Sequence, residues 1–234
     1  MSRVAVLCAR GGSVGVPGKN TRLIAGRPLI AWSIAQALES GLFAHVAVSS
    51  DSPDILEAAR QAGATLLVQR PDHLATDTVS VLPAVEHCLA AIEAHQGALV
   101  RSFVLLQATS PTREVADIKG AVALFDHHAC SSVITGCAAR ASPYFSLVEE
   151  TPQGTVILSK PTDPPIVRRQ DAPRCFDMNG SIYVVDRIRF ATQQQMIWPD
   201  TRLFEMSAEN SVDIDTLLDF RIAEMIMDTR HPRK

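Results

Sequence analysis

The sequence lacks an apolar run that approaches the roughly 18 residues of a membrane-spanning helix. Its first residues, MSRVAV, enter a strand-like pattern without the features of a signal peptide. It also lacks a cationic excess: the formal net charge is −3, whereas a surface for nucleic acid or an anionic membrane needs clear positive charge. We therefore expect a cytoplasmic protein that binds neither nucleic acid nor membrane.

Cysteines are few and scattered. They are odd in number and form no C-x-x-C pair, which argues against a disulfide framework and a thiolate zinc site. We expect reduced thiols at Cys8, Cys88, Cys130, Cys137 and Cys175. Internal repeats and low-complexity tracts are also missing, and 234 residues, 47% of them hydrophobic, suffice for one sizeable core. We predict a single domain over residues 1–234.

The sequence does contain a regular alternation of apolar runs of strand length with segments of helical period. The strand-length runs lie at 4–7, 46–49, 65–68 and 103–107, and the helical segments at 28–39, 52–62, 79–94 and 115–125. Continuous apolar strands such as FVLLQ indicate burial on both faces, as in a parallel sheet covered by helices. The predicted fold is an α/β protein with an open, doubly wound, mainly parallel sheet.

The alternation breaks between about residues 143 and 177, where proline, threonine and charged residues separate short strand-like pieces. We interpret this segment as an excursion from the sheet that forms a lid or a dimer arm. The core then resumes with the strand GSIYVVD and ends with a helix at 216–227.

The loop CARGGSVGVPGKN follows the first predicted strand and contains four glycines with two cations, Arg10 and Lys19. Ligands of doubly wound sheets bind at the carboxyl ends of the strands, and glycines let backbone N–H groups approach an anion closely. The loop is neither a Walker A motif, because five residues separate Gly12 from Gly18, nor a G-x-G-x-x-G motif. It therefore predicts a phosphate cradle, the alternative being a tight turn with a solvated arginine and lysine.

A second candidate site is SVDIDTLLDF, where Asp213 and Asp215 point to the same face of an extended segment and could converge on Mg²⁺. The alternative is that Asp215 is the N-cap of the last helix. A full capping box is not expected, because Leu218 stands where Glu or Gln would reach back. Asp219, one turn further on, is left outside the metal's ligand set.

Four more stretches place polar residues where packing does not require them, and each has a structural alternative. LLQATSPTR ends a buried strand with Gln107, Thr109, Ser110 and Arg113, although Ser110 could instead cap a helix. VRRQDAP holds two adjacent arginines suited to a carboxylate or phosphate, or simply solvated. MNGSIY is explained by a tight turn. RPDHLATDTVS offers Arg70, Asp77 and Ser80 before a long helix, which Ser80 or Thr78 could simply cap.

Together and in this order, these stretches resemble the acylneuraminate cytidylyltransferases, or CMP-sialic acid synthetases, including bacterial relatives that act on legionaminic and related nonulosonic acids. The resemblance covers nearly the whole chain and rests on ARGGSVGVPGKN, RPDHLATDTVS, LLQATSPTR, RRQDAP, NGSIY and SVDIDTLLDF. It implies a nucleotide-diphospho-sugar-transferase-like fold, CTP and Mg²⁺ (with Mn²⁺ as an alternative), and a homodimer in which the excursion of one subunit reaches toward the partner's site.

The resemblance also implies a reaction in which CTP and a free nine-carbon α-keto sugar acid give the CMP-sugar and pyrophosphate. The catalytic residues implied are Arg10, Lys19, Asp213 and Asp215, of which the two aspartates hold the metal. The implied CTP-binding residues are Arg10, Gly11, Ser13, Lys19, Asn20, Arg70 and Ser80. The implied sugar-acid residues are Gln107, Arg169 and Gln170. No side chain stands out as a general base.

The chain departs from the family at one position of the loop, where Val14 replaces the lysine of GGSKG. Either the cradle relies on Arg10, Lys19 and the metal, which we favour, or the chain has drifted from efficient CTP turnover. Two other functions stay open: activation of 3-deoxy-manno-octulosonate, whose family loop is closer to ARYxSTRLPGKPL, and a nucleotide-binding regulatory module without turnover. The double glycine and Asn20 argue against the first, and the paired aspartates against the second.

Overall fold

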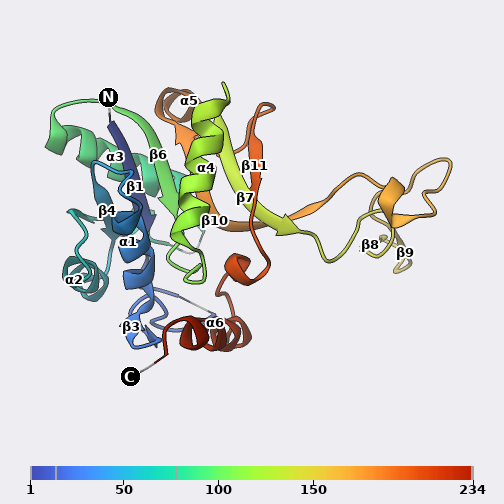
Figure 1. The fold of residues 1–234 in the computed structure, drawn as a ribbon, viewed down its shortest axis with the longest axis horizontal. Coiled ribbons are helices and arrows are strands. Elements are labelled where there is room, and N and C mark those ends of the chain that lie inside the picture. The colour runs from blue at the N-terminus through green and yellow to red at the C-terminus, as the bar shows by residue number, and fades with distance from the viewer. Residues whose placement is uncertain (1, 14, 77, 233–234) are drawn as a thin grey trace.

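The computed structural model describes residues 2–13, 15–76 and 78–232 of the chain. Its centre is a seven-stranded sheet in the order β11-β7-β10-β6-β1-β4-β5 (Figure 1). These strands are β1 (Ser2–Cys8), β4 (Val46–Ser50), β5 (Leu66–Gln69), β6 (Val100–Leu106), β7 (Ser132–Ala138), β10 (Phe176–Asp186) and β11 (Arg202–Glu205). Neighbouring strands are parallel except at β10, which runs antiparallel to both β6 and β7. The predicted α/β fold with a mainly parallel sheet is confirmed.

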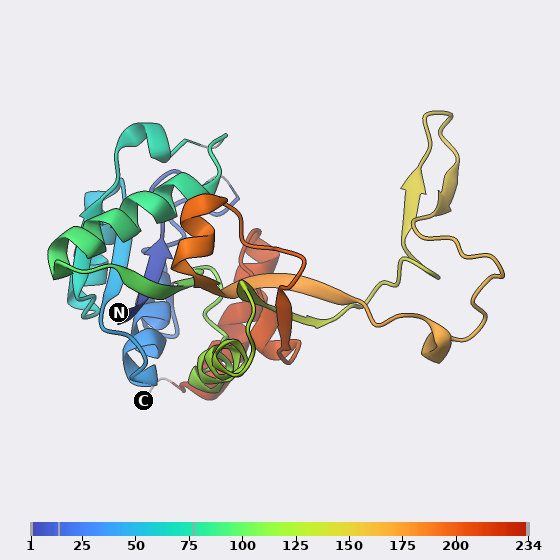
Figure 2. The same cartoon turned by 90° about the horizontal axis from the view of Figure 1, so that it is seen from above.

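Helices cover both faces of the sheet. Figure 2 shows α3 and α5 on one face and α1 and α4 on the other. The helices are α1 (Leu29–Ser40), α2 (Pro53–Gln61), α3 (Val81–Gln96), α4 (Val115–His127), α5 (Arg187–Thr192) and α6 (Leu217–Arg230). Two short hairpins add β2 (Leu23–Ile24) with β3 (Arg27–Pro28), and β8 (Val148–Glu150) with β9 (Val156–Leu158).

Burial on both faces explains why the apolar run of β1 is continuous. Val4 and Val6 pack in the apolar cluster that contains α3, whereas Ala5 and Leu7 pack in the cluster that contains α1, α2 and α4. All four side chains are fully buried. Since successive side chains of a strand point to opposite faces, both faces of this strand must be apolar.

The sequence NGSIY does not form the turn that we expect. Asn179 and Gly180 lie inside β10, where the pairing with β7 shifts register between Met178 and Tyr183. Gly180 has a φ of 65°, which glycine adopts without strain, and the buried amide of Asn179 accepts hydrogen bonds from Thr135 Oγ1 at 2.7 Å and from the backbone N–H of Ser181 at 3.1 Å. The two residues therefore form a bulge that side-chain hydrogen bonds hold in place.

Between β7 and β10 the chain leaves the sheet, and we call residues 139–175 the projecting segment. Figures 1 and 2 show it extending far to one side of the sheet, with the β8-β9 hairpin at its end. The excursion expected at 143–177 overlaps it, but Phe176 and Asp177 already pair with β7. Several of its apolar side chains are exposed, among them Val148, Val156 and Val167.

A third apolar cluster joins the glycine-rich loop to the C-terminal helix. It contains Val16 from the loop, Leu29 and Trp32 from α1, and Ile214 and Phe220 from the end of the chain. The segment that contains Asp213 and Asp215, which we call the aspartate segment, is thus packed against the glycine-rich loop. All strands of the central sheet except β1 lie between the two in the sequence.

Candidate active site

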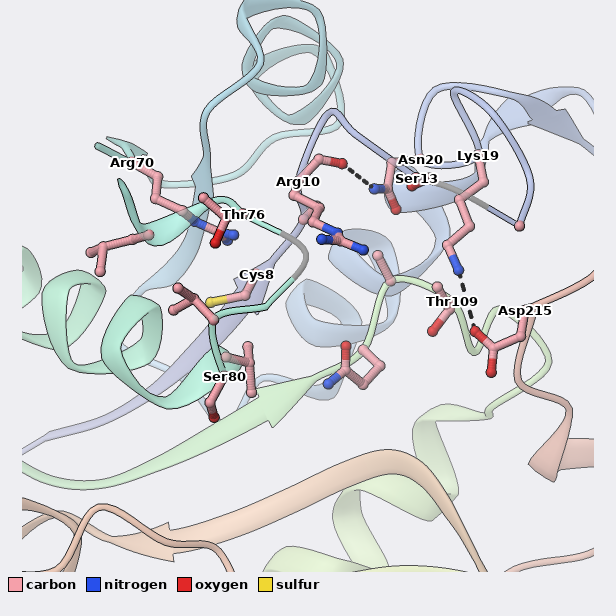
Figure 3. A pocket seen from close by; sticks show the side chains of 17 residues that line it. Cys8, Arg10, Ser13, Lys19, Asn20, Arg70, Thr76, Ser80, Thr109 and Asp215 are labelled. Atoms are coloured by element: carbon pink, nitrogen blue, oxygen red, sulfur yellow. Dashed lines mark hydrogen bonds and ion pairs between the residues drawn. The ribbon is translucent and has the colours of Figure 1, made fainter. Parts of the chain in front are cut away.

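A cavity of about 370 Å³ lies at the carboxyl ends of β1 and β6 (Figure 3). Its walls come from the glycine-rich loop, the segment before α3, the end of β6 and the chain before α6. The lining residues are Cys8, Ala9, Arg10, Ser13, Gly15, Lys19, Asn20, Arg70, Leu74, Thr76, Val79, Ser80, Val81, Gln107, Ala108, Thr109 and Asp215. Ligands of doubly wound folds bind at this edge of the sheet. Of the described residues implied by the resemblance, Gly11, Asp213 and Gln170 are not among those lining it.

Side-chain hydrogen bonds fix the shape of the glycine-rich loop. The buried Asn20 donates from Nδ2 to the carbonyl oxygen of Arg10 at 3.1 Å, which holds the two ends of the loop together. The backbone N–H of Gly11 donates to Asp51 Oδ1 at 3.0 Å. A carboxylate at the end of β4 thus accepts the Gly11 N–H, and the implied role of Gly11 in binding CTP stays a prediction.

The loop approaches the aspartate segment closely at one glycine. A Cβ atom at Gly15 would collide with the carbonyl oxygen of Asp215, so no larger residue fits without movement. Close by, Lys19 Nζ donates to the carbonyl oxygen of Ile214 at 2.6 Å and lies 3.5 Å from Asp215 Oδ1 (Figure 3). The structure thus places one predicted phosphate-binding cation directly beside one predicted metal ligand.

Asp213 lies behind this pair. Its Oδ1 atom is buried and has no hydrogen-bond partner within the described part of the chain. Burial raises the pKa of Asp213, a hydrogen bond from Thr109 opposes this, and the negative charge of Asp215 raises the pKa further. The Oδ2 atom faces Gly180 of the β10 bulge, where a Cβ would stand 3.9 Å from it. A buried carboxylate oxygen without a donor is unfavourable unless a cation or proton meets it.

Asp215 is not the N-cap of the last helix, contrary to the structural alternative. Thr216 occupies that position, and its Oγ1 accepts from the backbone N–H of Asp219, while Asp219 Oδ2 accepts from the Thr216 N–H at 2.7 Å. This is a full capping box, so the expectation that none would form is wrong: with Thr216 in place of Asp215 as the N-cap, the residue that reaches back is Asp219 and not Leu218. Its hydrogen bonds from Thr216 lower the pKa of Asp219. Asp215 is thereby left free of the cap and its side chain is 77% exposed.

Arg70 and Ser80 line the opposite wall. The buried guanidinium of Arg70 donates to the carbonyl oxygen of Ser49 at 2.7 Å and to its Oγ at 3.2 Å. Ser80 caps α3 by accepting from the backbone N–H of Leu82 at 3.3 Å, so its structural and cavity-lining roles coexist. Cys8 lies beside Arg70, and burial raises the pKa of its thiol to about 11, although Arg70 acts in the other direction.

A second pocket, of about 350 Å³, adjoins the first and shares Ser80, Val81 and Gln107 with it. We call it the apolar pocket, because its other lining residues are mostly apolar: Leu82, Leu105, Met178, Tyr183, Gln195, Met196 and Ile197. Burial raises the pKa of Tyr183, and the charge of Asp213 adds to this. Sequence reasoning missed this pocket, because apolar residues at strand positions look the same whether they line a pocket or fill a core.

The stretch after β6 meets the expectation only in part, because Gln107 and Thr109 line the cavity whereas Ser110 and Arg113 do not. Helix α4 begins at Val115 with Glu114 as its N-cap, so Ser110 caps no helix, and its buried Oγ has no partner within the described chain. Arg113 does not face a ligand, because its side chain is buried among α1, β6 and β10. Gln107 alone of the set lines both pockets.

The RRQDAP stretch lies on the projecting segment. Arg168 forms an ion pair with Asp171 at 2.7 Å, and Gln170 lines a shallow surface of the segment itself. Residue 169 begins a short 3₁₀ helix, but its side chain lies outside the described structure, as does all of Val14. The structure therefore does not bring Gln170 to the cavity of its own chain.

The described residues lack two kinds of feature. They contain no group of three or more His, Cys, Asp or Glu side chains arranged to hold a metal ion. Nor do they include a helix with the length and apolar character needed to cross a membrane.

Comparison with known proteins agrees with this geometry. The chain is 38% identical over 228 residues to a CMP-N,N'-diacetyllegionaminic acid synthase of Campylobacter jejuni, covering 97% of this chain and 96% of that protein. It is 36% identical, with the same coverage, to the post-translational flagellin modification protein B of Campylobacter coli. The solved structure of a CMP:2-keto-3-deoxy-manno-octonic acid synthetase in complex with CTP matches with a TM-score of 0.70 at 20% identity, covering 98% of this chain and all of that one. The cytidylyltransferase family matches residues 4–206. With that match over most of its length, the chain belongs to the cytidylyltransferase family and is a nucleotidyltransferase.

Proposed function

We propose that the protein transfers CMP from CTP to a free nonulosonic acid, a sugar acid of the sialic acid type, and releases pyrophosphate. The observation that carries this proposal is the junction of the two pockets at Gln107. A polar cavity with Arg10 and Lys19 suits a nucleoside triphosphate, and the adjoining apolar pocket suits a sugar with apolar substituents.

The chemistry requires the anomeric hydroxyl oxygen of the sugar acid to attack the α-phosphorus in line. The new P–O bond replaces the bond to the bridging oxygen, pyrophosphate leaves, and the hydroxyl proton is lost to solvent. Arg10 and Lys19 bind the phosphates and offset the charge that grows on the leaving group. Arg70 and Ser80 lie on the wall that receives the cytidine, and Gln107 orients the sugar acid toward the phosphorus.

Asp213 and Asp215 are the residues that would hold Mg²⁺, with Mn²⁺ as the alternative. The unpartnered Asp213 Oδ1 fits this role, and magnesium needs few protein carboxylates because substrate phosphates and water complete its coordination. When bound, the ion supplies Lewis-acid stabilisation of phosphate charge. Lys19, held next to Asp215, keeps the loop and the two carboxylates at one fixed spacing.

We further propose a cytoplasmic homodimer in which the projecting segment serves the site of the second subunit. Arg169 and Gln170 lie on this segment, away from the cavity of their own chain, and exposed apolar residues such as Val148 and Val156 would be covered in such a dimer. Arg169 would then pair with the carboxylate of the sugar acid.

The apolar pocket favours a sugar acid with apolar acyl groups over 3-deoxy-manno-octulosonate, whose substituents are hydroxyls. Leu105, Met196 and Ile197 can pack on acyl methyl groups but offer no partner to a hydroxyl. The likeness to the octonic acid synthetase, at 20% identity, concerns the fold alone.

Pyrophosphate release from CTP with a panel of sugar acids tests the proposal. We expect turnover with di-N-acylated nonulosonic acids, weaker turnover with N-acetylneuraminic acid, and the weakest with 3-deoxy-manno-octulosonate. Preference for the octulosonate would overturn the substrate class. Specific nucleotide binding without turnover of any sugar acid would support a regulatory module instead.

A further inference from the structure

The side chain of Arg113 is buried to 1% exposure, and none of its hydrogen-bond partners in the described structure is a carboxylate. Its guanidinium donates to Ser33 Oγ at 2.7 Å, to the carbonyl oxygen of Ser181 at 2.8 Å and to Gln36 Oε1 at 3.2 Å. Burial lowers its pKa to about 9, with only the more distant charge of Asp117 acting against this. A buried cation with neutral partners is costly, so its geometry must compensate.

The partners of Arg113 belong to three different elements. Ser33 and Gln36 lie on α1, Ser181 lies in β10 immediately after the bulge, and Gln107 follows β6. The carbonyl oxygen of Gln107 accepts from Arg113 Nη1 at 3.4 Å and from Ser33 Oγ at 3.0 Å. One guanidinium therefore joins the end of β6 and the middle of β10, next to the bulge, to α1. The planar arrangement of its donors makes this possible.

The end of β6 and the bulge of β10 both carry residues of the sugar-acid half of the site. Gln107 lines the junction of the two pockets, and β10 supplies Met178 and Tyr183 to the apolar pocket. Gly180, next to Ser181, faces the Asp213 carboxylate. The glycine-rich loop and Arg70, by contrast, are held by hydrogen bonds to Asn20, Asp51 and Ser49.

We propose that Arg113 is a positioning residue for the sugar acid: it fixes the spacing between Gln107 and the β10 bulge from behind the site, without touching substrate. The inference rests on the proposed function. It predicts that loosening this network weakens use of the sugar acid much more than use of CTP.

The test compares Arg113→Lys and Arg113→Met with Arg187→Met. Arg187 is also largely buried, but it pairs with Glu86 and Glu93 between α5 and α3, so its loss disturbs packing elsewhere. For both Arg113 variants we expect the KM for the sugar acid to rise about tenfold relative to that for CTP, the size expected when a hydrogen bond to a charged group is lost. Arg187→Met should lower the melting temperature without changing the KM for the sugar acid relative to the KM for CTP. Ser181→Ala is a milder change and should also raise the KM for the sugar acid relative to the KM for CTP. It replaces the Arg113 variants in the test if these do not fold.

A second measurement does not depend on turnover. Hydrogen exchange of the backbone amides at residues 105–109 and 178–184 should speed up in the Arg113 variants and stay unchanged in Arg187→Met. Equal KM changes for both substrates, or unchanged exchange in these segments, would overturn the inference. If the wild-type protein turns over no sugar acid, the proposed function fails, and the exchange result still decides whether Arg113 fixes the end of β6 and the bulge of β10.

Discussion

The ammonium group of Lys19 lies between two parts of the aspartate segment, 2.6 Å from the carbonyl oxygen of Ile214 and 3.5 Å from the carboxylate of Asp215. The second contact is open to water on the Asp215 side, so it contributes at most about 1 kcal/mol to stability. We therefore expect Lys19 to matter more for binding phosphate than for folding.

We predict that Lys19→Met lowers kcat/KM for CTP by about 1.5–3 kcal/mol of transition-state stabilisation, because a charged hydrogen bond to phosphate is lost. The melting temperature should change little. Initial rates at varied CTP, with thermal unfolding of the same samples, check both parts. Lys119→Met, at an exposed position on α4, is the matched control and should leave the rates unchanged. Equal effects of the two substitutions would contradict a role of Lys19 at the phosphates.

Asp213→Asn should abolish metal-dependent turnover while leaving the metal-free protein as stable as the wild type or more so. Burial raises the pKa of Asp213 above its value of 3.8 in the unfolded chain, so the charged form is disfavoured in the folded state. The wild-type carboxylate therefore costs stability at neutral pH, and this cost disappears as the pH falls below the unfolded value. Asp215→Asn removes an exposed carboxylate and should lose turnover without gaining stability. Titration of Mg²⁺ against initial rate, with denaturant unfolding at pH 7 and pH 3, measures these effects.

The capping box of α6 gives a pH prediction of opposite sign. Asp219→Ala should cost about 1 kcal/mol at neutral pH, the usual loss for a helix cap. Because hydrogen bonds from Thr216 lower the pKa of Asp219, its contribution is present above the unfolded value of 3.8 and is lost as the pH falls through the lower folded value. We expect urea unfolding of both proteins from pH 7 to pH 2.5 to show that the difference between their free energies of unfolding shrinks as the pH falls. A difference in the free energy of unfolding that did not change with pH would mean that the carboxylate charge plays no part in the cap.

Arg169→Ala should raise the KM for the sugar acid much more than the KM for CTP, by about 1.5–3 kcal/mol if it pairs with the sugar carboxylate. Mixing this variant with Lys19→Met tests whether the segment acts on the other subunit. In a mixed dimer, one site would combine an intact cradle with an intact projecting segment. Activity clearly above that of either parent would support action between subunits, and no recovery on mixing would place Arg169 elsewhere.

Val14→Lys should increase kcat/KM for CTP, because it restores the cation that the family places in this loop. The gain should be about 0.2–1 kcal/mol if the new ammonium is exposed to solvent, and it should shrink as ionic strength rises. Rates at low and high salt check this. No gain at either salt concentration would indicate that position 14 points away from the phosphates.

Much of the fold could be predicted from sequence because the helices α1 to α4 and the strands between them alternate with clear periodicity. The antiparallel direction of β10 could not, because a strand has the same pattern in either direction and only the route of the chain decides. That route is the long projecting segment, which returns the chain to the sheet without a crossover helix. The short α5 and β11 are below the length at which periodicity is informative.

For the site, the glycine-rich loop and Asp215 were predictable because backbone approach and charge leave direct marks in the sequence. Arg113 shows the limit: an arginine after a sheet strand suggests a ligand contact, whereas burial among three elements, visible only in the structure, gives it another role. Gly11 is similar, because its expected free N–H is taken by Asp51 from a distant strand. The contacts of Gly11 and Arg113 are made with residues far away in the sequence, and a local sequence pattern does not identify those residues.

The contact between Gly15 and Asp215 also sets an order of events during synthesis. The loop is translated well before the surface against which it packs, which includes Ile214 and Phe220. A growing chain can therefore form the first four strands of the sheet and still lack one wall of its nucleotide cavity. We expect CTP to stabilise the chain only after α6 has emerged and docked, so that nucleotide binding reports on the last step of folding.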